Sequence, residues 1–204
     1  MSTRKHLLPL YCLIFITLVW IWAAINPLDR YDWAMENILF IISFTALIAT
    51  YRRFKFSNAS YILIAIFFTL HLVGSHYTYA KVPLGFWISD ALDIKRNHFD
   101  RIVHFSYGLL LVYPFREILL RLINVKGFWS YYLAIDIILC CSGFFEILEW
   151  LFTLQVSPEL QQAYLGMQGD IWDAQKDMAL AFLGSLIGTI GVLVEGKCVT
   201  TIKS

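Results

Sequence analysis

Residues Leu7–Ile25 have the sequence LLPLYCLIFITLVWIWAAI, an apolar run that follows the cations Arg4 and Lys5. This run is long enough for the ~20 residues that cross a bilayer. A secretory signal peptide would begin in the same way. That alternative fits less well, because the run exceeds a typical apolar region of about 7–15 residues and ends near Trp20 and Trp22 rather than at a small-residue cleavage site. We therefore expect a first transmembrane helix, anchored by interfacial tryptophans.

The whole chain has the composition of a membrane protein. It is 59% hydrophobic and only 15% charged, which is not typical of a soluble domain. A formal net charge of +1 without a basic stripe excludes nucleic acid as a partner and leaves the lipid bilayer. The sequence predicts an all-α polytopic membrane protein, a six-transmembrane-helix bundle that forms one domain over residues 1–204, with spans at about 7–25, 35–50, 59–75, 98–122, 129–152 and 171–194.

Lysine and arginine concentrate in the segments that join alternate spans. Three cations lie between residues 52 and 55, and the fourth span ends near Arg116 and Arg121. By the positive-inside rule these segments face the cytoplasm, which predicts that both termini are inside. Residues 77–97 contain no apolar run long enough to cross, so we expect them to lie on the outer surface with their aromatic side chains at the interface.

The cysteines lie inside or beside apolar segments and lack the spacing of a metal site. Because free cysteine is among the most buried residue types, we expect core thiols. The four positions are Cys12, Cys140, Cys141 and Cys198.

The predicted topology brings ionisable side chains from four spans to one depth, the outer third of the membrane. Several of them are three or four residues apart, so that a helix presents them on one face. Ionisable groups inside a membrane are costly and are functional candidates by default. The set is His71, His76, Asp100, His104, Glu146, Glu149, Asp170, Asp173 and Asp177.

Some of these residues also have structural explanations. Asp170 follows a glycine and would serve as a helix N-cap, and the helix dipole would favour Asp173 in the first turn. Arg101 could pair with the glutamates of the neighbouring span, and His71 could hydrogen-bond between helices. Asp177 lies beyond the reach of capping, so its burial requires a partner.

The remaining pattern favours a metal or catalytic site. Carboxylates a turn apart in a low dielectric cannot all stay ionised without a cation or a shared proton. Histidine with several carboxylates suits Zn, Mn or Mg. We expect catalytic roles for Asp100, His104, Glu146 and Asp177, and metal ligation by His104, Glu146, Glu149, Asp173 and Asp177.

Four motifs resemble the YjdF-like bacterial inner-membrane proteins, a domain family of unknown function. They are Gly74–Ala80 (GSHYTYA), Val82–Trp87 (VPLGFW), Arg96–Arg101 (RNHFDR) and Gly169–Met178 (GDIWDAQKDM). The resemblance covers nearly the whole chain. It implies a multi-pass protein of the bacterial plasma membrane with no established activity.

A weaker similarity is to VanZ-like membrane proteins, in which Asp-x-x-x-His opens one helix, an acid lies in the next and an Asp precedes a glycine-containing helix. Asp100 and His104, Glu146, and Asp177 match these positions, whereas Ala181 stands where that family tends to have Asn. The similarity supports the same candidate site.

Three functions are compatible with the sequence. The first is an enzyme or metal-dependent binding site for an envelope or lipid-linked substrate at the outer face. The second is a small transporter or proton-coupled carrier. The third is a structural membrane protein in which the acids only fix the packing of the helices. The convergence of four spans favours the first.

Overall fold

The computed structural model describes residues 7–93, 95–154, 168 and 170–202. Within these residues the chain forms only helices, of which six are long and apolar enough to cross a membrane. This confirms the predicted all-α fold and its six spans. The helices are α1 (Leu7–Ala24), α2 (Arg30–Thr50), α3 (Asn58–His76), α4 (Pro83–Leu92), α5 (Phe99–Arg121), α6 (Phe128–Thr153) and α8 (Asp173–Ile202).

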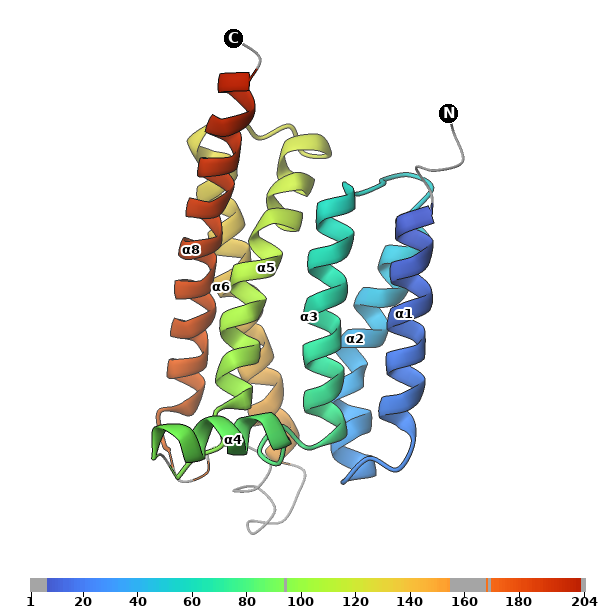
Figure 1. Cartoon of the computed structure of the whole chain (residues 1–204), viewed down its shortest axis with the longest axis vertical. Helices are drawn as coiled ribbons and strands as arrows, with labels where there is room; N and C mark the ends of the chain where they lie inside the picture. Colours follow the sequence, from blue (N-terminus) through green and yellow to red (C-terminus); the bar gives the residue numbers. More distant parts are fainter. Residues whose placement is uncertain (1–6, 94, 155–167, 169, 203–204) are drawn as a thin grey trace.

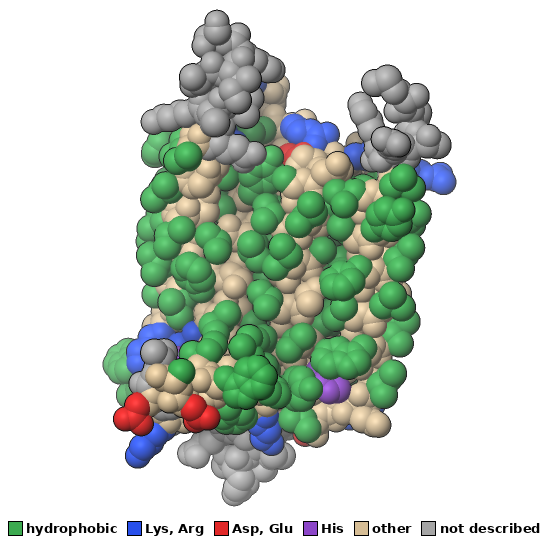
Figure 2. Space-filling view, in the orientation of Figure 1, with side chains coloured by type: hydrophobic (Ala, Val, Ile, Leu, Met, Phe, Trp, Pro, Cys, Tyr) green, Lys and Arg blue, Asp and Glu red, His purple; other side chains and the backbone are tan. Residues whose placement is uncertain are grey.

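The six long helices run side by side, and the short helix α4 lies across one end of them (Figure 1). We name this end of the bundle the α4 end. Helix α1 begins and α8 ends at the opposite end, which we name the terminal end. Hydrophobic side chains cover the sides of the bundle, while charged side chains gather at the two ends (Figure 2). The assignment of the terminal end to the cytoplasm stays a prediction from the distribution of lysine and arginine.

Helix α2 begins earlier than the apolar run suggested. The side chain of Asp29 accepts hydrogen bonds from the backbone N–H of Tyr31 (2.8 Å) and of Asp32 (3.0 Å), so it caps a helix that starts at Arg30. The expected start near residue 35 was therefore too late. The earlier start places Asp32 and Glu36 one turn apart inside the membrane-spanning helix.

The segment between the third and fourth spans contains the short helix α4. Pro83 at its first turn suits a helix start, and Asp93 ends it in a left-handed conformation with φ of 53°. Trp87 and Phe86 are exposed on it. The expectation of aromatic side chains at the surface holds for Phe86 and Trp87 and was wrong for Tyr79, which is buried against His71.

Close packing of α5 on α8 sets the position of the site. A Cβ atom added at Gly108 of α5 would lie 1.9 Å from the carbonyl oxygen of Ala181, and one added at Gly184 of α8 would lie 2.1 Å from that of Phe105. Small residues allow two helix backbones to approach closely in a membrane. These contacts fix the first turns of the two helices beside each other.

The prediction of buried cysteines was wrong for two of them. Cys140 and Cys141 are exposed on α6, and Cys12 is half-buried on α1. The side chain of Cys198 lies outside the described residues. Thiols behave as small apolar groups, so a surface that faces lipid is as suitable for them as a core.

Candidate metal centre at the α4 end

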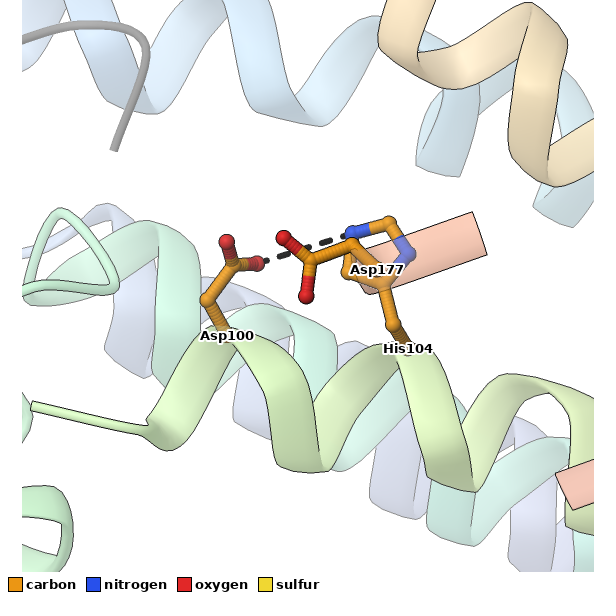
Figure 3. Close-up of side chains that lie close together, drawn as sticks. All are labelled: Asp100, His104 and Asp177. Atoms are coloured by element: carbon orange, nitrogen blue, oxygen red, sulfur yellow. Dashed lines mark ion pairs between the residues drawn. The ribbon is translucent and has the colours of Figure 1, made fainter. Parts of the chain in front are cut away.

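Three predicted residues from two helices meet near the α4 end. Asp100 and His104 lie one turn apart in the first turns of α5, and Asp177 lies on the facing part of α8. Each offers one ligand atom, and these atoms all lie within 4.8 Å of one another. Figure 3 shows the three side chains gathered on one side of α5. His104 Nε2 is 3.6 Å from Asp100 Oδ1.

Glu146 of α6 adds a third helix to this group. Its Oε1 atom lies 3.4 Å from His104 Nε2. The side chains of His104, Glu146 and Asp177 are all buried, and the edge of the Phe145 ring packs on the imidazole with a centroid distance of 5.7 Å. Asp100, His104 and Asp177 thus form one group of possible ligands, and Glu146 contacts its imidazole from a third helix.

Several oxygens of this region are buried without a hydrogen-bond partner. Among the described side chains these include Asp177 Oδ1, Glu146 Oε1 and Glu36 Oε2. Leaving a buried acceptor unsatisfied costs about 1–3 kcal/mol, and more when it is charged. The contact from Glu146 to His104 is close but is not aligned as a hydrogen bond. A cation beside His104 would satisfy the oxygens of Asp177 and Glu146.

The spacing of the donor atoms suits a small metal ion. Ligands at about 2.0–2.2 Å from a tetrahedrally coordinated ion are about 3.4 Å from one another. The distances from His104 Nε2 to Glu146 and to Asp100, 3.4 and 3.6 Å, agree with this geometry. An imidazole with carboxylates is a ligand set for Zn or Mn, and the carboxylates alone also suit Mg.

Asp173, one turn before Asp177, lies in a different environment. Its Oδ2 pairs with Arg96 at 2.5 Å and its Oδ1 with Arg101 at 3.2 Å. Arg101 also pairs with Asp170 at 2.6 Å, so the sequence-based pairing of this arginine with the glutamates of α6 is not what the structure shows. Metal ligation by Asp173 stays a prediction, and it competes with two ion pairs.

Asp170 holds the turn that leads into α8. Its Oδ1 accepts a hydrogen bond from the backbone N–H of Trp172 at 3.1 Å, and Lys176 contacts its Oδ2 at 2.6 Å. Lys176, the Trp172 N–H and Arg101 hold the pKa of Asp170 well below its ordinary value. The N-cap expected at Asp170 thus lies too early in the chain, because α8 starts at Asp173. Asp170 instead holds Arg101 and Lys176 beside the site by ion pairs.

Glu149 points to a second group of acids. It lines a cavity of about 40 Å³ between α2 and α6, together with Asp32 and Glu36. Glu146 lies within hydrogen-bonding reach of Glu149 and connects this group to His104. Asp32 and Glu36 were not expected in the site: the predicted second span began after Asp32, and Glu36 lay inside that span but was not among the candidate residues. Their spacing of four residues, the same as that of Asp100 and His104, was the available signal.

His71 is satisfied by two neighbours and does not join the metal centre. Its Nδ1 accepts from the Tyr79 hydroxyl at 2.6 Å, and its Nε2 lies 3.2 Å from the carbonyl oxygen of Glu36. Burial raises the pKa of Tyr79 well above its ordinary value, so the phenol keeps the proton that it donates. The expected hydrogen bonding of His71 between helices is what the structure shows, and it connects α2, α3 and the segment before α4.

His76 lies at the edge of the bundle. Its Nδ1 is 3.1 Å from the carbonyl oxygen of Ala23, and its ring stacks on Trp22 with a centroid distance of 4.6 Å. It therefore joins α3 to α1. His76 belongs to the packing of the bundle rather than to the cluster around His104.

Comparisons with known proteins identify the family. The family model described as "Predicted membrane protein (DUF2238)" matches residues 8–196. The chain is 36% identical to the inner membrane protein YjdF of Escherichia coli (strain K12) over 189 residues, which cover 92% of this chain and 90% of that protein. No solved structure matches the chain significantly.

These matches confirm the resemblance to YjdF-like inner-membrane proteins. Together with the six apolar helices they make the chain a multi-pass protein of the bacterial inner membrane, in contact with the lipid bilayer. The chain belongs to the DUF2238 family of predicted membrane proteins.

Proposed function

We propose that this protein binds one divalent cation at the α4 end of the bundle and uses it to hold or to transform an envelope or lipid-linked substrate. The ligands are His104, Asp100, Asp177 and Glu146. The observation that carries the proposal is the group of buried carboxylate oxygens without hydrogen-bond partners that surrounds His104. Buried charges are normally paired or coordinate metals.

The chemistry of such a cation fits a phosphate-containing substrate. A bound divalent ion polarises a phosphoryl oxygen or lowers the pKa of a bound water. The surrounding groups add to this role: Arg96 and Arg101 lie above the site, and the acids Glu149 and Glu36 lie beside it. A substrate with an anionic headgroup would therefore bind the cation directly. It would also contact Arg96 and Arg101 at the edge of the site.

A purely structural role explains Asp170 and Asp173, the acids of the site nearest the α4 end, better than it explains Asp177 and Glu146. Arginine and lysine neutralise Asp170 and Asp173 by close ion pairs. One turn deeper, Asp177 Oδ1 and Glu146 Oε1 have no hydrogen-bond partner among the described residues. Acids that served only to fix the packing of helices would be expected to have such partners at both depths.

The test is the metal content of the protein purified in detergent. We expect about one equivalent of Zn, Mn or Mg after dialysis against each ion, measured by mass spectrometry of the elements. The double variant His104→Ala, Asp177→Asn should lose it, with an affinity at least about 100-fold weaker, since even outer-shell changes cost 10–100-fold.

Asp90→Asn is the matched control, because it removes one negative charge from an exposed position of α4 at the same end of the bundle. It should bind the cation as the unmodified protein does. Absence of stoichiometric metal from the unmodified protein for all three ions would refute the proposal. Equal binding by the double variant would show that the ion lies elsewhere.

A further inference from the structure

A large cavity continues from the candidate metal centre into the membrane-spanning part of the bundle. Its volume is about 530 Å³, within the range of about 300–1,000 Å³ that is usual for ligand pockets. Asp100 and His104 lie in its wall towards the α4 end. Leu111 and Ile118, two and four turns further along α5, line it towards the terminal end.

The wall of this cavity changes from polar to apolar along its length. Near the α4 end it includes Asp100, His104 and the hydrogen-bonded pair of His71 and Tyr79. Deeper in the membrane it is mostly aliphatic and aromatic. Its rings include Phe40, Phe67, Phe68, Phe115 and Phe144.

The cavity opens sideways between α2 and α6. Helix α2 packs on α3, whereas α6 packs on α5 and α8, and in Figure 1 both lie behind the other helices. Several cavity-lining residues on these two helices are exposed at the side of the bundle. Ser43 and Ala46 of α2 are small, and Phe144 of α6 is 55% exposed. The opening thus faces the hydrocarbon of the bilayer.

We infer that this cavity binds the hydrocarbon chain of an anionic membrane lipid, which enters between α2 and α6 and places its phosphate at the candidate metal centre. The inference rests on the proposed function, since the cation attracts the phosphate to an otherwise acidic group. It adds that the substrate is a lipid whose chain lies inside the bundle.

Physical arguments select a lipid chain as the occupant. A void of this size would forfeit the dispersion contacts of its whole lining. Apolar cavities do not hold water well, because water there lacks polar partners. The opening is beside lipid hydrocarbon. An acyl chain that moves from the bilayer into the cavity passes from one apolar environment to another and loses no hydration. Charge complementarity acts at the other end, where a divalent cation held by the carboxylates gives the phosphate a positively charged atom to coordinate.

The experiment uses the full chain in a phospholipid bilayer nanodisc. The probe is a phosphatidylglycerol with a photoactivatable diazirine near the end of one acyl chain. After illumination, the labelled residues are mapped by peptide mass spectrometry. We expect labelling of Leu111, which is buried in the cavity wall, in addition to lipid-facing residues. A diacylglycerol with the same chain, which lacks the phosphate, should label Leu111 less.

Two variants close the opening without touching a metal ligand. Ala46→Phe and Ser43→Phe each place a ring in the α2 wall, and Ile42→Phe is the control because Ile42 is 59% exposed on α2 but does not line the cavity. The first two should lose the labelling of Leu111, and the third should keep it. Thermal unfolding of each sample shows whether the variant is folded.

Metal content is measured on the same samples, so that the two proposals can fail separately. A bound cation with labelling confined to lipid-facing residues would overturn the lipid inference and leave the metal centre. Unchanged labelling of Leu111 in both folded opening variants, or equal labelling by the diacylglycerol probe, would also overturn it. Labelling of Leu111 in a protein that binds no metal would instead refute the metal centre.

Discussion

Replacement of Asp177 by asparagine should make the metal-free protein more stable and abolish its response to a cation. The Asp177 side chain is 2% exposed, and its Oδ1 has no hydrogen-bond partner among the described residues. Asparagine keeps the shape of the side chain, removes the charge and supplies N–H donors for the neighbouring carboxylate oxygens that lack a partner. An unsatisfied buried polar atom costs about 1–3 kcal/mol. The variant should recover a cost of that size when no cation is present.

The magnitude can be expressed as a melting temperature. One kcal/mol corresponds to about 2–4 °C for a chain of 150–250 residues, so metal-free Asp177→Asn should melt about 2–12 °C above the metal-free unmodified protein. A cation at 100 times its dissociation constant adds about 2.7 kcal/mol to the form that binds it. The unmodified protein should therefore gain about 5–11 °C on titration, and the variant should gain nothing.

The assay is thermal unfolding in detergent, followed by tryptophan fluorescence, with chelator and then with increasing Zn²⁺ or Mn²⁺. Asp90→Asn should behave as the unmodified protein in both conditions, because that residue is exposed on α4. The reasoning is refuted if metal-free Asp177→Asn melts below the unmodified protein. It is equally refuted if the cation shifts both proteins by the same amount.

Three further predictions concern the helices that hold the site. Gly108→Ala places a Cβ atom 1.9 Å from a carbonyl oxygen of α8, so it should lower the free energy of unfolding by about 1–3 kcal/mol and weaken cation binding. Gly191→Ala is the control, because a Cβ atom there has nothing within 4 Å. Melting and binding assays should show no loss of stability or affinity for this control. Glu117→Gln at the terminal end replaces one of the two carboxylate oxygens that accept from Ser57 at the start of α3 by an NH2 donor. It should cost about 1–3 kcal/mol, while the cation affinity measured by titration stays unchanged. The pKa of Asp170 is lowered in the folded protein, so the stability that this carboxylate contributes is complete above its unfolded pKa of about 3.9 and is lost as the pH falls below that value. The difference in melting temperature between the unmodified protein and Asp170→Asn should therefore be constant from pH 5 to 8 and shrink below pH 4. Constant differences down to pH 3, or an effect of Gly191→Ala equal to that of Gly108→Ala, would contradict these expectations.

The spans could be predicted because a bilayer demands long apolar helices, and that demand is visible as composition. The stacking of Asp100 on His104 could also be predicted, since it depends only on helical spacing. The start of α2 could not be obtained from apolarity, because the Asp29 side chain sets it before the apolar run begins. Asp32 was missed for that reason.

The different surroundings of Asp173 and Asp177 were beyond the reach of sequence patterns. The two residues are four apart on α8, so helical spacing gives them the same face. Their partners come from other segments, Arg96 and Arg101 for the first and the His104 group for the second. Which partner each meets depends on how far α8 slides along α5, and the contact of Gly108 with α8 sets that position.

This one-turn difference in depth is the strongest physical argument for a cation. At the rim, the chain neutralises Asp173 with two arginines. One turn deeper, where burial makes an ionised group more costly, Asp177 Oδ1 and Glu146 Oε1 have no hydrogen-bond partner among the described residues, and Glu146 contacts the imidazole of His104. A fixed arginine would stabilise this inner group permanently, and the carboxylates would use its N–H donors. An exchangeable cation neutralises the same carboxylates and keeps coordination positions for a phosphate, which is what a site for an anionic lipid requires.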